Sequence, residues 1–383
     1  MTILDYFHFT EFIIQELNEY ININGLLNTT KQLKEYKKKF FYWKLNETYS
    51  LKYYSNKDFS DYINSQILYG KKQLSIKLIR NINITDDGVH NLGNVHILNL
   101  SFCDRITDDG VCNLGNVHTL ILCWCDRITD DGVKHIGNVH TLKLSGCDKL
   151  TDDGVRFLGN VNTLDLGYCK KITDNSIKHL GNLNTLKLYN CSNITDEGIK
   201  HLGNLNTLDL TYCSKITDDG VKHLGKCNTL ILSHCYKITD EGIKHLGNCH
   251  TLILSHCDEI TDEGIKHLGN CHTLDLSHCY KITDDGIKHL GNCHTLDLSY
   301  CDNITSEGIK HLGTCHILTL TWCRGIDDET VIKYLYNSVH TLNLDWFITR
   351  VCVCSRCENY NNNLKIINTL CMVLFFLGSW YYI

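Results

Sequence analysis

The sequence HTLDLSHCYKITDDGIKHLGNC fills residues 272–293, and a near copy of it begins at once with His294. The copies recur with a period of 22 residues. A glycine marks the period as Gly88, Gly110, Gly132, Gly154, Gly198, Gly220, Gly242, Gly264, Gly286 and Gly308, and Ser176 replaces it once in register. A fixed period of this length is the signature of a solenoid, in which each repeat packs on its neighbours. The 383 residues therefore need no single large core.

Composition and cysteine spacing restrict the class of protein. The net charge of −6 is spread evenly, so the charge gives no indication of nucleic-acid binding. Residues 1–20 lack the basic start of a secretory signal peptide. The 22 cysteines fall mostly in columns at the repeat period, which predicts buried thiols of a cytoplasmic or nuclear protein rather than disulfides. The two columns are Cys103, Cys125, Cys147, Cys169, Cys191, Cys213, Cys235, Cys257, Cys279, Cys301 and Cys323, and Cys227, Cys249, Cys271, Cys293 and Cys315.

Each repeat predicts one strand and one short helix. Leu274 and Leu276 alternate with outward residues, as in a strand with one buried face. Thr283 is a helix N-cap, and Gly291 ends the helix as a glycine cap. Further inward positions are Cys279, Ile282, Ile287 and Leu290. Thirteen such strands between residues 73 and 344 predict an α/β fold, with a curved parallel sheet on the concave side and short helices on the convex side.

The pattern Leu-x-Leu-x-x-Cys-x-x-Ile-Thr-Asp-x-Gly-Ile-x-x-Leu-Gly resembles the leucine-rich repeat, in its cysteine-containing subfamily, over residues 73–344. Asn81 takes the cysteine position in the first unit, where leucine-rich repeats use Asn or Cys to bond the turn backbone. The last unit is two residues longer between Cys323 and Leu342, which is typical of a capping repeat. The resemblance implies a leucine-rich repeat solenoid behind a small N-terminal helical head.

Residues 1–45 lie outside the repeat and are predicted to form two or three short helices, the last ending near Tyr42 and Trp43. Cysteine-containing repeats commonly follow an F-box, a helical module that docks on the Skp1 adaptor of cullin–RING ubiquitin ligases. This head resembles an F-box in outline but lacks its Leu-Pro opening, because the chain has no proline. The whole layout resembles repeat proteins of giant DNA viruses. The resemblance implies that a Skp1-like adaptor contacts Phe12, Ile13, Leu17, Leu26 and Leu27.

Two further segments flank the repeats. Residues 46–72 are predicted to be a connector and N-terminal cap, with a last helix around Tyr62, Ile63 and Ile67. In residues 345–383, Cys352, Cys354 and Cys357 are one ligand short of a structural zinc site. The apolar run 366–383 has three interpretations: a cap over the open sheet edge, a membrane tail anchor, or a disordered or frame-shifted end.

Titratable residues repeat without a single focus, which argues against an enzyme, a metal or a cofactor. A catalytic site needs one geometry, whereas Ser, His and Asp recur in every unit. The Asp pairs are explained by helix starts without calcium. One histidine column is predicted on the convex side: His135, His179, His201, His223, His245, His267, His289 and His311. A second column precedes the strands, with rings about 5 Å apart: His96, His118, His140, His250, His272, His294, His316 and His340.

The variable outward positions are the candidates for partner binding. They lie between the two strand leucines or just before the cysteine column, and Trp and Tyr are the types that become interface anchors. The alternative is that these rings only pack along the sheet rim. The candidates are Trp124, Tyr168, Tyr212, Ile231, His234, Ile253, His256, Asp275, His278, Asp297, Tyr300 and Trp322.

The sequence therefore predicts a non-enzymatic protein-binding adaptor. The family resemblance implies the substrate-recognition subunit of a Skp1–cullin–F-box ubiquitin ligase, with its target on the concave face. The alternative is a leucine-rich repeat interaction scaffold without a ubiquitin-ligase role, tail-anchored in a membrane through residues 366–383.

Overall fold

A computed structural model describes residues 42–45, 47–61, 63, 73–335, 338–344 and 351–352. The predicted adaptor-docking residues and the apolar run 366–383 lie outside these residues. The chain divides into two compact units, Met1–Lys187 and Leu188–Ile383, which we call unit 1 and unit 2.

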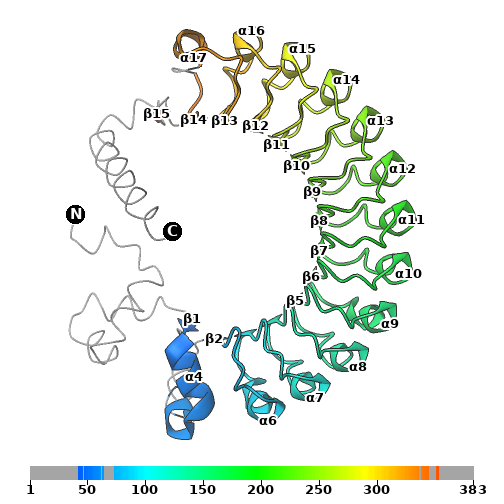
Figure 1. Ribbon diagram of the computed structural model, residues 1–383, viewed down its shortest axis with the longest axis vertical. Coiled ribbons are helices and arrows are strands. Elements are labelled where there is room, and N and C mark those ends of the chain that lie inside the picture. Colours follow the sequence, from blue (N-terminus) through cyan, green and yellow to red (C-terminus); the bar gives the residue numbers. More distant parts are fainter. Residues whose placement is uncertain are drawn as a thin grey trace, which may run out of the picture. The chain divides into compact units, whose positions relative to one another are not determined.

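Unit 1 contains strands β1 to β7, each hydrogen-bonded in parallel to the next. The strands are β1 (Tyr42–Lys44), β2 (Gln73–Lys77), β3 (Ile97–Asn99), β4 (Thr119–Ile121), β5 (Thr141–Lys143), β6 (Thr163–Asp165) and β7 (Thr185–Lys187). The helices are α4 (Glu47–Ser55), α6 (Asp86–Val89), α7 (Asp108–Val111), α8 (Asp130–Val133), α9 (Asp152–Val155) and α10 (Asp174–Ile177), with 3-10 turns η2 (His90–Leu92) and η3 (Arg156–Leu158). The strands line the inner side of the curve and the repeat helices its outer side (Figure 1).

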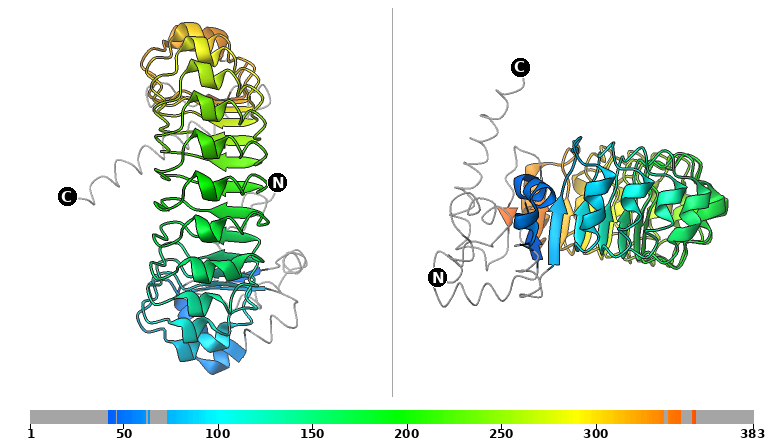
Figure 2. Two further views of the ribbon diagram at one scale, coloured as in Figure 1. Left: turned by 90° about the vertical axis from the view of Figure 1, so that its right-hand side faces the viewer. Right: turned by 90° about the horizontal axis from the view of Figure 1, so that it is seen from below.

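Unit 2 repeats this arrangement, and its helices follow one another on the side that faces the viewer in the left view of Figure 2. Its strands are β8 (Thr207–Asp209), β9 (Thr229–Ile231), β10 (Thr251–Ile253), β11 (Thr273–Asp275), β12 (Thr295–Asp297), β13 (Ile317–Thr319), β14 (Thr341–Asn343) and β15 (Val351–Cys352). Its helices are α11 (Asp196–Ile199), α12 (Asp218–Val221), α13 (Asp240–Ile243), α14 (Asp262–Ile265), α15 (Asp284–Ile287), α16 (Ser306–Ile309) and α17 (Asp328–Tyr334). Pairing is parallel and in register, as Leu252 opposite Leu274 shows, except that β15 runs antiparallel to β14.

The predicted leucine-rich repeat solenoid is confirmed, and its thirteen strands correspond to β2 to β14. Strands β1 and β15 were not predicted. The prediction of a helix ending at Tyr42 and Trp43 is wrong, because these residues pair with Gln73 and Leu74 of β2. The edge of β2 supplies backbone partners that an isolated short helix lacks. Helix α4 was also missed, and Tyr62 and Ile67 of the predicted cap helix lie outside the described residues.

The core consists of the columns that the period predicted. Leu274, Leu276, Ile282, Ile287 and Leu290 are all fully buried. Each buried leucine or isoleucine contributes roughly 1.5–3 kcal/mol relative to an exposed one. Because every repeat repeats the same columns, this burial is continuous along each unit.

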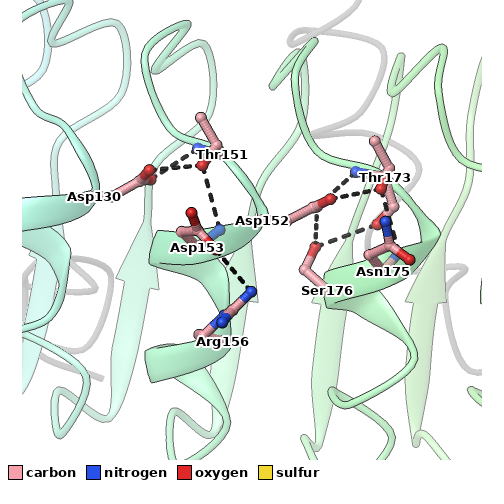
Figure 3. Close-up of polar contacts among 8 residues, drawn as sticks. All are labelled: Asp130, Thr151, Asp152, Asp153, Arg156, Thr173, Asn175 and Ser176. Atoms are coloured by element: carbon pink, nitrogen blue, oxygen red, sulfur yellow. Dashed lines mark hydrogen bonds and ion pairs between the residues drawn. The ribbon is translucent and has the colours of Figure 1, made fainter.

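Each helix start also joins its repeat to the next one. Figure 3 shows that the carboxylate of Asp152 accepts hydrogen bonds from Thr173, at 2.8 Å from the backbone nitrogen and 2.5 Å from the hydroxyl. Asp130 bonds Thr151 in the same way, at 2.8 and 2.6 Å. The sequence explained these aspartates only by the helix dipole. Their main contact is a two-pronged clamp between successive repeats. Ser306, which takes the aspartate position once, bonds Asp327 of the next repeat instead.

The repeated glycines are required by close approach. A Cβ atom at Gly264 would lie 2.4 Å from Oδ1 of Asp240, and one at Gly291 would lie 2.6 Å from the carbonyl oxygen of His311. The prediction that Gly291 ends the helix is wrong, since α15 ends at Ile287 with Lys288 at its C-cap. Ser176 fits in the glycine column because its hydroxyl donates to Asp152 over 2.7 Å (Figure 3).

Candidate protein-binding face

The residue before Asn81 and before each cysteine of the column from Cys103 to Cys323 adopts a left-handed backbone. Its φ lies between 55° and 61° at Arg80, Phe102, Trp124, Tyr168, Asn190, Tyr212, His234, His256, His278, Tyr300 and Trp322, and is 75° at Gly146. The conformation lets the chain leave the strand while its amide still donates to the next repeat, as from His278 to Ser299 over 2.8 Å. It costs a non-glycine residue roughly 1–2 kcal/mol. The sequence analysis missed this backbone, although Gly146 and Asn190 in the same column were a signal for it.

In unit 2 this column forms one continuous stack of six rings. The ring centroids are 4.1 Å apart from Tyr212 to His234, 4.1 Å from His234 to His256, and 3.9 Å from His256 to His278. Tyr300 follows at 4.1 Å, and Trp322 lies 5.8 Å beyond it. Aromatic pairs add about 0.5–1.5 kcal/mol each, which offsets the left-handed backbone.

In unit 1 the stack is shorter. The guanidinium of Arg80 lies 4.7 Å from the Phe102 ring, and the Phe102 and Trp124 centroids are 6.2 Å apart. Trp124 also reaches Tyr168 at 5.4 Å, across Gly146. A Cβ atom at Gly146 would lie 2.4 Å from the indole ring, so this glycine makes room for the tryptophan.

The rings both pack along the rim and remain accessible. Exposure is 37% for Trp124, 47% for Tyr212, 37% for Tyr300 and 51% for Trp322, and Tyr168 is half-buried. The two interpretations of these aromatics are therefore compatible, because each ring contacts at least one neighbouring ring and is still partly exposed. Whether a partner binds there stays a prediction.

Two tyrosines and one aspartate surround the histidines of the unit 2 stack. The hydroxyls of Tyr236 and Tyr280 lie 2.9 and 3.0 Å from Nδ1 of His234 and His278. Burial, with the neighbouring His256, lowers the pKa of both these imidazoles. Asp258 lies between the two tyrosines in sequence register, and its Oδ1 is buried without a hydrogen-bond partner.

The strand positions next to this stack carry carboxylates and an apolar pair. Asp275 on β11 is the register partner of Asp297 on β12. Oδ1 of Asp275 accepts from the Ser277 amide at 2.9 Å, and Oδ1 of Asp297 accepts from the Ser299 amide at 2.9 Å. Burial raises the pKa of Asp297, and the charge of Asp275 adds to the rise. The remaining predicted residues Ile231 and Ile253 are register partners on β9 and β10, and both are half-buried.

Comparison with known proteins agrees with this geometry. A leucine-rich repeat family model matches residues 94–115, 138–159, 204–225, 250–269, 272–291 and 294–313. The chain carries leucine-rich repeats. A search of curated proteins finds no match.

Solved structures share the fold of these leucine-rich repeats. A chain of the yeast Rad7–Elc1 complex matches with a TM-score of 0.53 at 17% identity, over 90% of this chain and 95% of that one. An internalin of Listeria monocytogenes matches at 19% identity, over 68% and 83%, and the TLR13–ssRNA13 complex at 21%, over 72% and 43%. Both have a TM-score of 0.48. These likenesses concern the fold alone.

The histidines before the strands stack on one another at the N-terminal ends of the strands, opposite the first stack. In unit 2, the centroids of His250, His272, His294 and His316 are 4.4 to 4.5 Å apart, and His340 follows at 4.3 Å. Within the described part of the chain, no group of three or more His, Cys, Asp or Glu could hold a metal ion. Stacked rings present their faces to each other, so their nitrogens do not converge.

The column cysteines of the leucine-rich repeats are structural. The thiol of Cys257 donates to the carbonyl of Leu232 over 3.3 Å, and burial raises its pKa to about 12. Cys279 and Cys301 are buried in the same way, with raised pKa values. In the first unit Oδ1 of Asn81 accepts from the Asn83 amide at 2.9 Å, as the resemblance implied. Thiols held in the neutral form are poor nucleophiles.

Proposed function

We propose that this protein is a non-enzymatic adaptor that holds a protein target on the concave face of its leucine-rich repeats. Repeats of this kind form protein-interaction scaffolds. The observation that carries the proposal is the unit 2 stack from Tyr212 to Trp322, which places partly exposed rings beside the inner face of the sheet. Preordered aromatic side chains bind with little loss of conformational entropy, which favours a protein partner.

The finer part of the proposal concerns the head. Residues 1–45 resemble an F-box in outline, and the proposed role is docking on a Skp1-like adaptor, so that the protein is the substrate-recognition subunit of a ubiquitin ligase. The protein would act by proximity in the cytoplasm or nucleus, of a host cell if its gene is viral, as the resemblance to giant-virus repeat proteins implies. The yeast structure of similar fold is itself a complex, of Rad7 with Elc1, and the match spans 95% of the matched chain.

The position of β1 determines where a deletion that tests the head may end. A deletion of residues 1–45 would remove Tyr42–Lys44 and expose the edge of β2. A deletion of residues 1–40 leaves this strand in place. We expect purified Skp1 to bind the full chain and to lose binding to this deletion and to the Leu17→Asp/Leu26→Asp variant, as measured by pull-down and calorimetry.

The matched control is Asp275→Asn, which changes the concave face and should leave Skp1 binding intact. Failure of Skp1 to bind the intact protein, or equal binding to the variant without residues 1–40, would exclude the ubiquitin-ligase role. The repeats would then remain an interaction scaffold.

The alternative function is a repeat scaffold without a ubiquitin-ligase role, anchored in a membrane. The observation in its favour is the apolar run 366–383. Among the described residues, no helix is long and apolar enough to cross a membrane. Cell fractionation of the full chain and of a chain truncated after Asn363 tests the alternative. An anchor predicts that only the full chain sediments with membranes.

A further inference from the structure

The described strands of unit 2 present an acidic inner face, and none of their middle residues is Lys or Arg. Its middle strand residues are Asp209, Ile231, Ile253, Asp275, Asp297, Thr319 and Asn343. In unit 1 the corresponding positions include Lys143 and Lys187 beside Asp165. Only unit 2 therefore presents uncompensated negative charge on its inner sheet face.

Asp275 and Asp297 are the closest carboxylates on this face. They are register partners on neighbouring parallel strands, which lie about 4.8 Å apart. Within the described part of the chain, neither forms an ion pair with Lys or Arg. Their Oδ1 atoms accept from Ser277 and Ser299, whereas no described residue donates to Oδ2 of either. Two like charges side by side are unfavourable until a cation joins them.

The aromatic stack runs along the ends of the same strands. His278 and Tyr300 follow Asp275 and Asp297 by three residues, and their rings are stacked at 4.1 Å. Trp322 extends the stack and is half exposed. An arginine guanidinium is planar, bonds two carboxylate oxygens with its fork of donors, and is attracted to aromatic rings. A cationic side chain bound here could therefore contact both the carboxylates and the aromatic rings, because they lie within one or two repeats of each other.

We propose that the concave face of unit 2 binds a basic, extended segment of the protein target, with an arginine placed between Asp275, Asp297 and the rings of Tyr300 and Trp322. The segment approaches a sheet face that is lined with Thr, Ser and Asp, so it binds through side chains and not by adding a strand. This inference rests on the proposed function and specifies the chemistry of the partner.

The test uses the full chain and a fluorescein-labelled nonapeptide of alternating serine and arginine. A second peptide carries citrulline in place of arginine, which keeps the shape and removes the charge. Fluorescence anisotropy should show binding of the arginine peptide alone, weakened by added salt. Hydrogen bonds to charged groups imply that Asp275→Asn/Asp297→Asn lowers the affinity at least about tenfold. Trp322→Ala should lower it about threefold.

The matched control is Asp209→Asn. Asp209 occupies the same strand position, and its Oδ1 accepts from the Thr211 amide at 3.0 Å, but its register partner on β9 is Ile231. Asparagine keeps the Oδ1 acceptor in all three positions, so the turns should survive, and circular dichroism checks this. The control should change the affinity less than threefold.

Three results would overturn the proposal: equal binding of the arginine and citrulline peptides, an unchanged affinity in the double variant, or an equal loss in Asp209→Asn. The last would show general attraction to an acidic surface. Failure here leaves Skp1 binding untouched, and failure of Skp1 binding leaves this peptide test untouched, so the two proposals are separable.

Discussion

Asp240→Ala removes one clamp between successive repeats. Oδ1 of Asp240 accepts from the Thr261 amide at 2.8 Å, and Oδ2 accepts from the Thr261 hydroxyl at 2.6 Å. A hydrogen bond to a charged group contributes about 1.5–3 kcal/mol. Both bonds are half-buried, so the lower value applies to each, and the loss in free energy of unfolding should be about 3 kcal/mol.

The neighbouring Glu241→Ala is the matched control. Glu241 is a carboxylate one residue away, but it is 74% exposed and pairs with Lys244, the C-cap residue of the same helix. Exposed ion pairs contribute little to stability. The pair of variants therefore separates a contact between repeats from a surface charge.

Urea unfolding of the full chain, followed by circular dichroism, measures the loss. Because each repeat contacts only its neighbours, hydrogen exchange adds a local measurement. A loss of about 3 kcal/mol corresponds to roughly 100-fold faster exchange of the Thr261 amide. If Asp240→Ala destabilises the protein no more than Glu241→Ala does, the clamp does not join the repeats.

Gly264→Ala should cost about 2 kcal/mol, because its Cβ would lie 2.4 Å from the aspartate oxygen of the preceding repeat; an unchanged urea midpoint would contradict this. Ser176→Gly should cost about 1 kcal/mol through the lost bond to Asp152, and a gain in stability would count against that bond. Burial raises the pKa of Cys257 from 9.0 to about 12, so the native state holds more protons than the unfolded state between these pH values, and stability should fall as the pH rises above 9. Urea midpoints that stay level up to pH 10 would argue against this. The pKa of His278 is lowered from 6.5, so the unfolded state binds the proton more readily, and the melting temperature should fall between pH 7 and pH 5. The fall should be smaller in His278→Phe, and an equal fall in both proteins would refute a role for this imidazole.

Much of the fold was predictable because residues with the same structural role recur at the same position in many repeats. Leu274 and Leu276 recur in every unit, and a column of this kind has one explanation, which is burial in a continuous core. The period also showed that the cysteines are structural. Their buried, hydrogen-bonded thiols agree with that interpretation.

The contacts between repeats were harder to predict. The first acidic position of the helix start is Asp in nearly every unit, whereas the second varies between Asp, Asn and Glu. That difference indicates a specific contact of the first position. It was not recognised, because the helix dipole favours an acidic residue at both positions equally. The two oxygens of Asp240 accept from the amide and the hydroxyl of Thr261, which a helix-dipole argument does not predict.

The candidate site was predicted by position but not by conformation. The sequence analysis placed Tyr212, His278 and Trp322 outside the core, yet it did not foresee their left-handed backbone or their stacking into one column. Stacking depends on the spacing of neighbouring strands, which brings residues 22 positions apart into ring contact. The strand β1 was missed because its partner β2 lies 31 residues further along the chain, as the pairing of Tyr42 with Gln73 shows.

The most direct test of the proposed division of labour between head and repeats is a quantitative binding measurement with two probes. Purified Skp1 and the serine–arginine nonapeptide are titrated in turn into the full chain, the chain without residues 1–40, and Asp275→Asn/Asp297→Asn. We predict that the deletion abolishes Skp1 binding and keeps peptide binding, while the double variant does the reverse. Loss of both ligands from either variant, or of neither from both, would contradict a separate head and concave binding face.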